Sequence, residues 1–169
     1  MLDSHRIQIG NTLGKEKNMS ENLGLTPYLV VSDAAAAIEF YIAAFDAEEL
    51  SRHLAPHSER IMHSHLKIYG SNLMLSDDFG VEMGGKSETP VALGGSSVTL
   101  ALEVKDATAV WDKAVAAGAV VTMPLADQFW GERYGQFKDP FGHKWSISQT
   151  IAHPSREDID KAAAESFSG

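Results

Sequence analysis

The chain of 169 residues contains no cysteine. A disulfide framework, a thiolate nucleophile and a zinc site built on cysteine are therefore excluded. Long apolar runs are also absent, since none approaches the roughly 20 residues that span a bilayer. The N-terminus lacks the charged and apolar regions of a secretory signal. These absences predict a cytoplasmic protein with no membrane partner.

Positive charge is scarce in this sequence. Lysine and arginine number 14 against 23 aspartates and glutamates, which gives a formal net charge of -9. A phosphate backbone or an anionic lipid surface would repel such a chain. Nucleic acids are therefore not expected as partners.

Two stretches of the chain carry the same order of secondary-structure signals. The first stretch predicts a strand over 25–31, an N-cap at Asp33, a helix over 34–45, and strands over 49–54, 60–69 and 72–76. The second predicts a strand over 97–104, a cap at Asp106, a helix over 107–117 ended by Gly118, and strands over 120–123, 135–138 and 144–149. A short surface helix or dimer clasp is predicted over 155–166.

The two stretches form an internal repeat. Thr26 and Asp33 correspond to Thr99 and Asp106 at a constant offset of 73 residues (99 − 26 and 106 − 33). A half-sheet of this size cannot bury its apolar face alone, so the two halves must share a core. The predicted organisation is a polar tail over 1–22, one domain over 23–152 (module 1 about 23–78, connecting loop 79–96, module 2 about 97–152) and a helical tail over 153–169.

Six segments of this sequence occur in a familiar order. They are Thr26-Pro-Tyr-Leu-Val-Val-Ser-Asp33, Phe40-Tyr41, Met62-His-Ser-His-Leu66, Met74-Leu-Ser-Asp77, Phe129-Trp-Gly-Glu-Arg-Tyr-Gly135 and Asp139-Pro-Phe-Gly-His-Lys-Trp145. Together they resemble the PhnB-like branch of the vicinal-oxygen-chelate (glyoxalase/bleomycin resistance/dioxygenase) superfamily. The resemblance covers about residues 25–150.

The resemblance implies an α+β fold in which two tandem βαβββ modules form an open, incomplete barrel around a cleft. It also implies a homodimer that binds a small molecule. The superfamily includes isomerases, extradiol dioxygenases, thiol transferases and drug-sequestering proteins, so membership alone does not fix a reaction.

The metal positions of the family can be read onto this chain. They are Thr26 and Thr99 on the first strands, Met74 or Leu75 on one last strand, and Ser146 on the other. None of these residues offers the imidazole or carboxylate that a divalent ion needs. We therefore predict that the usual metal centre is missing and that no cofactor is required.

His63 and His65 offer an alternative metal site, because residues two apart on a strand project to one face. The structural alternative is that both line the cavity as hydrogen-bonding groups, while His53 and His57 lie in a solvated loop. Imidazole also titrates near neutrality, so His63 or His65 could serve as a general base.

An aromatic ring close to a guanidinium suits an anionic or aromatic ligand. The candidate ligand-binding residues are Tyr28, His63, His65, Trp130, Arg133, Tyr134 and Ser146. An ordinary salt bridge is the alternative role for Arg133. A further pattern matches the consensus of a phosphate-binding loop, at Gly80-Val-Glu-Met-Gly-Gly-Lys-Ser87. Such a loop must be followed by a helix, and Pro90 lies where that helix would run.

Three functions are consistent with these residues. The first is metal-free binding of a small anionic or aromatic molecule in the cleft between the modules. The second is a metal-dependent isomerase, lyase or dioxygenase-type enzyme that uses His63 and His65. The third is a dimeric accessory protein without a small ligand.

Overall fold

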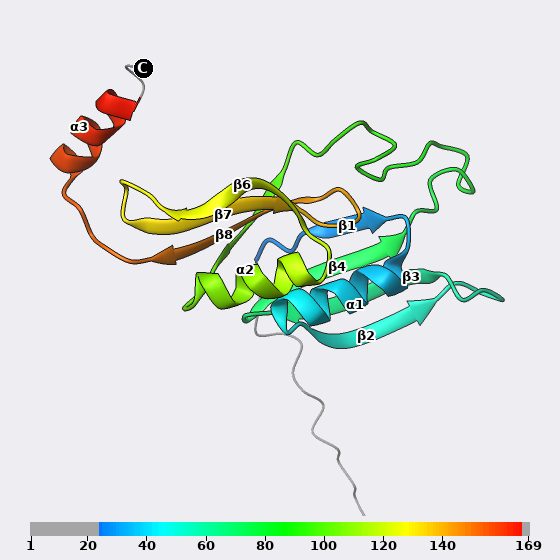
Figure 1. The fold of residues 1–169 in the computed structure, drawn as a ribbon. Coiled ribbons are helices and arrows are strands. Elements are labelled where there is room, and N and C mark those ends of the chain that lie inside the picture. Colours follow the sequence, from blue (N-terminus) through cyan, green and yellow to red (C-terminus); the bar gives the residue numbers. More distant parts are fainter. Residues whose placement is uncertain (1–23, 167–169) are drawn as a thin grey trace, which may run out of the picture.

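The computed structural model describes residues 24–166, which form two four-stranded sheets and three helices (Figure 1). The first module contains β1 (Tyr28–Val31), α1 (Ala34–Phe45), β2 (Glu48–Leu54), β3 (Ile61–Ile68) and β4 (Ser71–Asp77). The second contains β5 (Thr99–Glu103), α2 (Ala107–Ala116), β6 (Val120–Asp127), β7 (Glu132–Lys138) and β8 (Lys144–Thr150), and α3 (Arg156–Ser166) follows. The predicted tail over 1–22 lies outside the described residues.

The two sheets have equivalent strand orders, β1-β4-β3-β2 and β5-β8-β7-β6. In each, the first strand of the module pairs in parallel with the last, and the remaining pairs are antiparallel. Within residues 24–166 no strand of one sheet pairs with a strand of the other, so the barrel is open. The predicted α+β fold of two βαβββ modules is confirmed.

Helices α1 and α2 each begin directly after the aspartate that the sequence predicts as the N-cap. The carboxylate of Asp33 accepts from the backbone N–H of Ala36 at 2.9 Å, and that of Asp106 accepts from Ala109 at 3.0 Å. Each bond satisfies a donor that the first turn of a helix leaves unpaired. The repeat therefore extends to the atoms that start each helix.

A second pair of equivalent side chains ties each helix to the last strand of its own sheet. Asp77 accepts from the N–H of Ala34 at 2.8 Å, and Gln149 accepts from that of Ala107 at 3.1 Å. Asp77 and Gln149 are 72 residues apart (149 − 77), close to the repeat offset. The amide oxygen of Gln149 in the second module thus accepts the same hydrogen bond from the start of the helix as the carboxylate of Asp77 does in the first.

The two modules share one core, as the repeat predicts. Helices α1 and α2 lie side by side between the sheets (Figure 1). The Phe45 ring on α1 lies 4.7 Å from Trp145 and 6.3 Å from Phe137, both in the second module. Tyr41, one helical turn before Phe45, lies 5.6 Å from Trp145. Aromatic side chains of module 1 therefore complete the core of module 2.

The two largest departures of the second module from its predicted strand bounds are in β6 and β7. β6 continues through Pro124 to Asp127, because its pairing with β7 shifts register between Met123 and Ala126. A proline without an N–H is tolerated at such an irregularity on an edge strand. β7 begins at Glu132, three residues before the predicted start.

The remaining segments are α3 and the loop between the modules. No residue of α3 is buried, and the helix stands away from both sheets (Figure 1). The loop after Asp77 forms turns, and no helix follows Lys86 and Ser87 before β5. The phosphate-loop pattern therefore lacks the helix that its chemistry needs. None of the described helices has both the length and the apolar character needed to cross a membrane.

Candidate functional site

Each sheet turns one face to the helices and leaves the opposite face open. In the first sheet Leu29 pairs with Leu75, and both are buried. Tyr28 pairs with Met74, and strand alternation directs both to the open face. Of the two candidate metal positions on this strand, Met74 therefore lies on the open face and Leu75 in the core.

The family metal positions do not suit a divalent ion in this chain. Thr26, Thr99 and Ser146 offer hydroxyl groups, and Met74 offers a thioether. Divalent ions at such sites prefer imidazole, carboxylate or thiolate donors. Among residues 24–166 no three histidine, aspartate or glutamate side chains are grouped closely enough to hold a metal.

Three predicted site residues come together on the open face of the first sheet. Nδ1 of His63 lies 3.3 Å from the hydroxyl oxygen of Tyr28, which donates to the carbonyl oxygen of Met62 at 3.4 Å. His65 pairs with Met74, next to Tyr28. It is 7% exposed, and its Nε2 is buried without a hydrogen-bond partner.

His53 joins this group, although the sequence suggested a solvated loop. It lies in β2 directly opposite His63, and the two rings stack at 6.0 Å. Partial burial lowers the pKa of His63, and the nearby His53 and His65 lower it further. The register of the β2–β3 hairpin places His53 opposite His63. That register cannot be predicted from the sequence, because the turn between the two strands has six residues. His57 lies in that turn and is exposed.

The predicted residues of the second module form a separate patch on the open face of its sheet. Nε1 of Trp130 donates to Glu132 at 2.8 Å, and its ring meets Tyr134 edge-on at 5.9 Å. Gln136 donates to the Tyr134 hydroxyl at 2.7 Å and pairs with Ser146. Trp130, Tyr134 and Ser146 are therefore connected through Gln136 rather than through Arg133.

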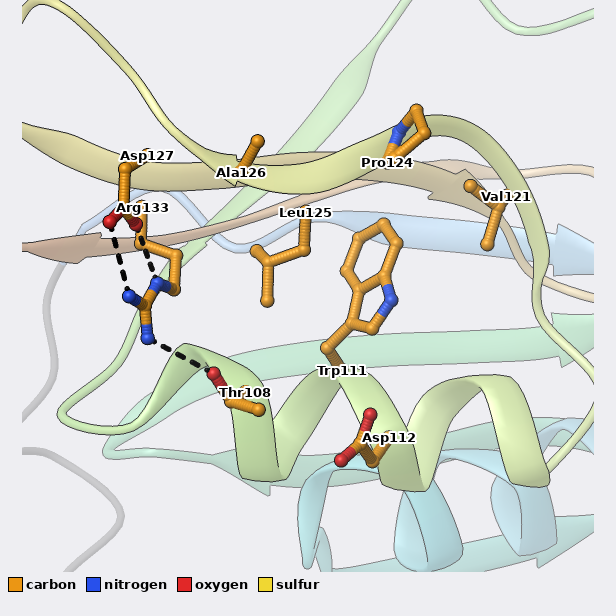
Figure 2. A pocket seen from close by; sticks show the side chains of 9 residues that line it. All are labelled: Thr108, Trp111, Asp112, Val121, Pro124, Leu125, Ala126, Asp127 and Arg133. Atoms are coloured by element: carbon orange, nitrogen blue, oxygen red, sulfur yellow. Dashed lines mark hydrogen bonds and ion pairs between the residues drawn. The ribbon is translucent and has the colours of Figure 1, made fainter.

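Arg133 points to the opposite side of this sheet, toward α2 (Figure 2). Its guanidinium binds both carboxylate oxygens of Asp127, at 2.7 and 3.2 Å, and donates to Thr108 at 3.3 Å. The hydrogen bond from Arg133 lowers the pKa of Asp127. The salt bridge considered from the sequence is the observed role of Arg133. It lines a hollow of about 590 Å³ beside Trp111.

A cavity of about 670 Å³ lies between the modules and is lined by residues of the edge strands β1 and β5. Of the predicted ligand-binding residues, Tyr28 lies on its wall. Among residues 24–166 no aspartate, glutamate, lysine or arginine lines it. The wall residues that concern its chemistry are Leu29, Val98, Ala101, Leu102, His143 and Trp145.

A second cavity, of about 770 Å³, lies between the open face of the first sheet and the loop that follows β4. Tyr28 borders this cavity as well. Its wall carries Asp77, Asp78 and Glu88 against the single cation Lys86. The surplus of carboxylates makes this cavity a poor site for an anion.

Arg60 fastens that loop over the second cavity. Its guanidinium binds the Glu82 carboxylate and the Asp78 carbonyl oxygen, and it lies 4.1 Å above the Phe79 ring. An exposed ion pair is screened by solvent, and a cation–π contact at the surface is weak. The loop is therefore held by a few local contacts.

We expect Arg60→Ala to free this loop while leaving the fold intact. Loss of these contacts should speed amide hydrogen exchange over residues 79–88 by about fivefold. Exchange in β6 and β8 should not change. Arg52→Ala is the control, because it removes an arginine of the same exposure, 40%, which pairs with Glu49 within β2. Equal exchange in both variants would show that Arg60 does not restrain the loop.

Comparison with known proteins places this geometry in a family. The sequence model of the glyoxalase/bleomycin resistance protein/dioxygenase superfamily matches residues 24–147. An uncharacterised protein of Mycobacterium tuberculosis is 46% identical over 86% of this chain and 85% of its own.

Solved structures have the same fold. A gene product of Arabidopsis thaliana is 32% identical, with a TM-score of 0.59 over 75% of this chain and 98% of its own. A PhnB protein from Bacillus cereus is 18% identical, with a TM-score of 0.58 over 75% and 99%. The chain therefore belongs to the glyoxalase/bleomycin resistance protein/dioxygenase superfamily.

Proposed function

We propose that this protein binds a small neutral or aromatic molecule in the cavity between its modules, without a metal at the family positions. One observation carries the proposal: the cavity has about 670 Å³, and none of the described residues on its wall is an aspartate, glutamate, lysine or arginine. Cavities of about 300–1,000 Å³ with mainly apolar walls are typical small-molecule sites. Members of the superfamily are known to bind small molecules, which supports this reading.

The wall chemistry favours an aromatic ligand over an anionic one. Tyr28 and Trp145 offer ring surfaces, and no lysine or arginine is present to pair with an anion. Arg133, the cation that suggested an anionic ligand, is already paired with Asp127 on the other side of its sheet. His143 directs Nε2 to the Val30 carbonyl at 3.3 Å, so that nitrogen carries a proton and acts as a donor.

Three finer assignments belong to the same proposal. The six sequence segments and the fold likeness to a PhnB protein support the PhnB-like branch. A homodimer is supported by the open faces of both sheets and by exposed apolar side chains such as Met83 and Val91. A cytoplasmic location stays a prediction from the sequence.

The test is a thermal-shift screen of neutral and anionic aromatic molecules in the presence of EDTA. A ligand at about a hundred times its Kd stabilises by about 2.7 kcal/mol, which raises the midpoint of a chain of this size by about 5–10 °C. Ala101→Phe should fill the cavity and weaken binding at least about tenfold. Val120→Phe, an exposed position outside the cavity, is the matched control.

Two results would contradict the proposal. Binding that survives Ala101→Phe unchanged would place the ligand elsewhere. A thermal shift that is absent in EDTA and appears when the screen is repeated with a divalent ion would favour the alternative, a metal-dependent isomerase, lyase or dioxygenase-type enzyme on His63 and His65. In the structure the buried Nε2 of His65 makes that pair a poor chelate. His53 and His63 are better placed than this pair to bind a metal ion together.

A further inference from the structure

We propose that His53 and His63 form a two-imidazole site for a borderline divalent cation, such as Ni²⁺, Zn²⁺ or Cu²⁺, on the open face of the first sheet. This goes beyond the proposed function, because neither residue lines the cavity between the modules. It also differs from the family metal position, whose residues lack suitable donors.

The strand pairing brings the two imidazoles together. His53 and His63 are direct partners across the antiparallel pair β2–β3. Directly opposite residues have their Cβ atoms about 4.5–5.5 Å apart on the same face of a sheet. The rings are nearly parallel, at 28°, with centroids 6.0 Å apart. Small rotations about the side-chain bonds can direct one nitrogen from each ring to a shared ion.

Tyr28 orients the His63 ring for this role. The Tyr28 hydroxyl gives its proton to the Met62 carbonyl oxygen, so its oxygen accepts from His63. This assignment puts the His63 proton on Nδ1 and the lone pair on Nε2. Metal-binding histidines characteristically donate their other ring N–H to an oxygen, which fixes the ring and its tautomer. His63 already has that arrangement.

The surroundings leave the pair accessible to an ion from solvent. His63 is only half-buried on this face of the sheet. His53 is exposed on the edge strand β2. Imidazole binds zinc, copper and nickel well. Since no third protein ligand is grouped with the pair among residues 24–166, water or a bound molecule would complete the coordination.

Isothermal titration of the untagged full chain with NiCl₂ and ZnCl₂ tests this site. We expect one ion per chain, with His53→Gln and His63→Gln each weakening binding at least about tenfold, because each removes half of the chelate. Tyr28→Phe keeps both ligands and removes the orienting hydroxyl, and loss of such a partner typically costs about 10–100-fold in affinity. His57→Asn, in the exposed turn of the same hairpin, should leave binding unchanged.

Absence of binding to the unaltered chain overturns the proposal, and so does an affinity in His53→Gln or His63→Gln that equals that of the unaltered chain. So does loss of binding in His57→Asn. A second measurement is independent of affinity: the imidazole nitrogen chemical shifts of His63 should show the proton on Nδ1 before metal is added. A proton on Nε2 would contradict the assigned geometry. Failure here leaves the cavity proposal standing, because that screen is run in EDTA.

Discussion

Replacing Asp139 by alanine should lower the free energy of unfolding by about 4 kcal/mol, among the largest effects of a single substitution. The carboxylate is 2% exposed and accepts four hydrogen bonds. Oδ1 accepts from the N–H groups of Phe141 and His143, at 3.0 and 2.9 Å. Oδ2 accepts from the Tyr41 hydroxyl at 2.7 Å and from Nε1 of Trp145 at 3.0 Å. Alanine would leave all four donors unpaired, and the hydrogen bonds from Tyr41, Phe141 and Trp145 are buried away from water.

Thermal and urea unfolding of the variant measure this loss. At about 2–4 °C per kcal/mol for a chain of this size, the midpoint should fall by about 10 °C. Tyr41→Phe removes one of the four donors and should cost about 1–2 kcal/mol. Asp112→Ala removes a carboxylate from the exposed side of α2 and should have little effect. A loss below 1 kcal/mol for Asp139→Ala would show that the four bonds are not maintained in solution.

Phe45→Ala should destabilise the protein by about 3–5 kcal/mol, because it empties the junction of the two modules. Phe45 is 1% exposed and lies within 6.5 Å, centroid to centroid, of Phe40, Tyr41, Phe137 and Trp145. A cavity at this point removes contacts from both halves of the molecule at once. Unfolding should stay a single transition, shifted to lower denaturant.

The control for this prediction lies on the same helix. Ile42→Ala removes an apolar side chain that is 44% exposed and should cost well under half as much. Near-equal losses for the two variants would mean that the helix itself, rather than its contact with the second module, limits stability. Two separated transitions in Phe45→Ala would show that the modules fold independently.

The sequence predicted the fold because its strongest signal was a repeat. The caps at Asp33 and Asp106 and the left-handed glycine at Gly118 are local features, set by the backbone groups next to them. Such features survive in any tertiary context. Their common spacing then required two equal modules, and the observed strand orders agree.

The candidate site was harder to predict because it depends on side-chain direction. Arg133 and Tyr134 are neighbours in sequence, and the early start of β7 places them on opposite faces of the sheet. The predicted strand begins at Gly135, so both residues lie outside it. The alternation of side chains along a strand therefore predicts no face for either of them. The same applies to His53, whose partner in β3 depends on the register across a turn.

One of the segments that carry the family resemblance has a structural role here. In Asp139-Pro-Phe-Gly-His-Lys-Trp145 the aspartate binds the tryptophan of the same segment and Tyr41 of the other module. Gly142 completes the turn at φ 93°, a conformation that side chains with a Cβ rarely adopt. This motif therefore serves the core of the domain, and two of its residues, His143 and Trp145, also line the cavity between the modules.

The contact between Tyr41 and Asp139 joins residues 98 positions apart, and this has a consequence for synthesis on the ribosome. Translation at about 5–20 residues per second separates the two residues by roughly 5–20 s. During that interval the aromatic face of α1 has been made, but Phe137 and Trp145 have not. In the nascent first half, Phe45 therefore lacks the rings of Phe137 and Trp145 that later pack against it. Chaperones that bind exposed apolar surface are expected to bind this half during synthesis.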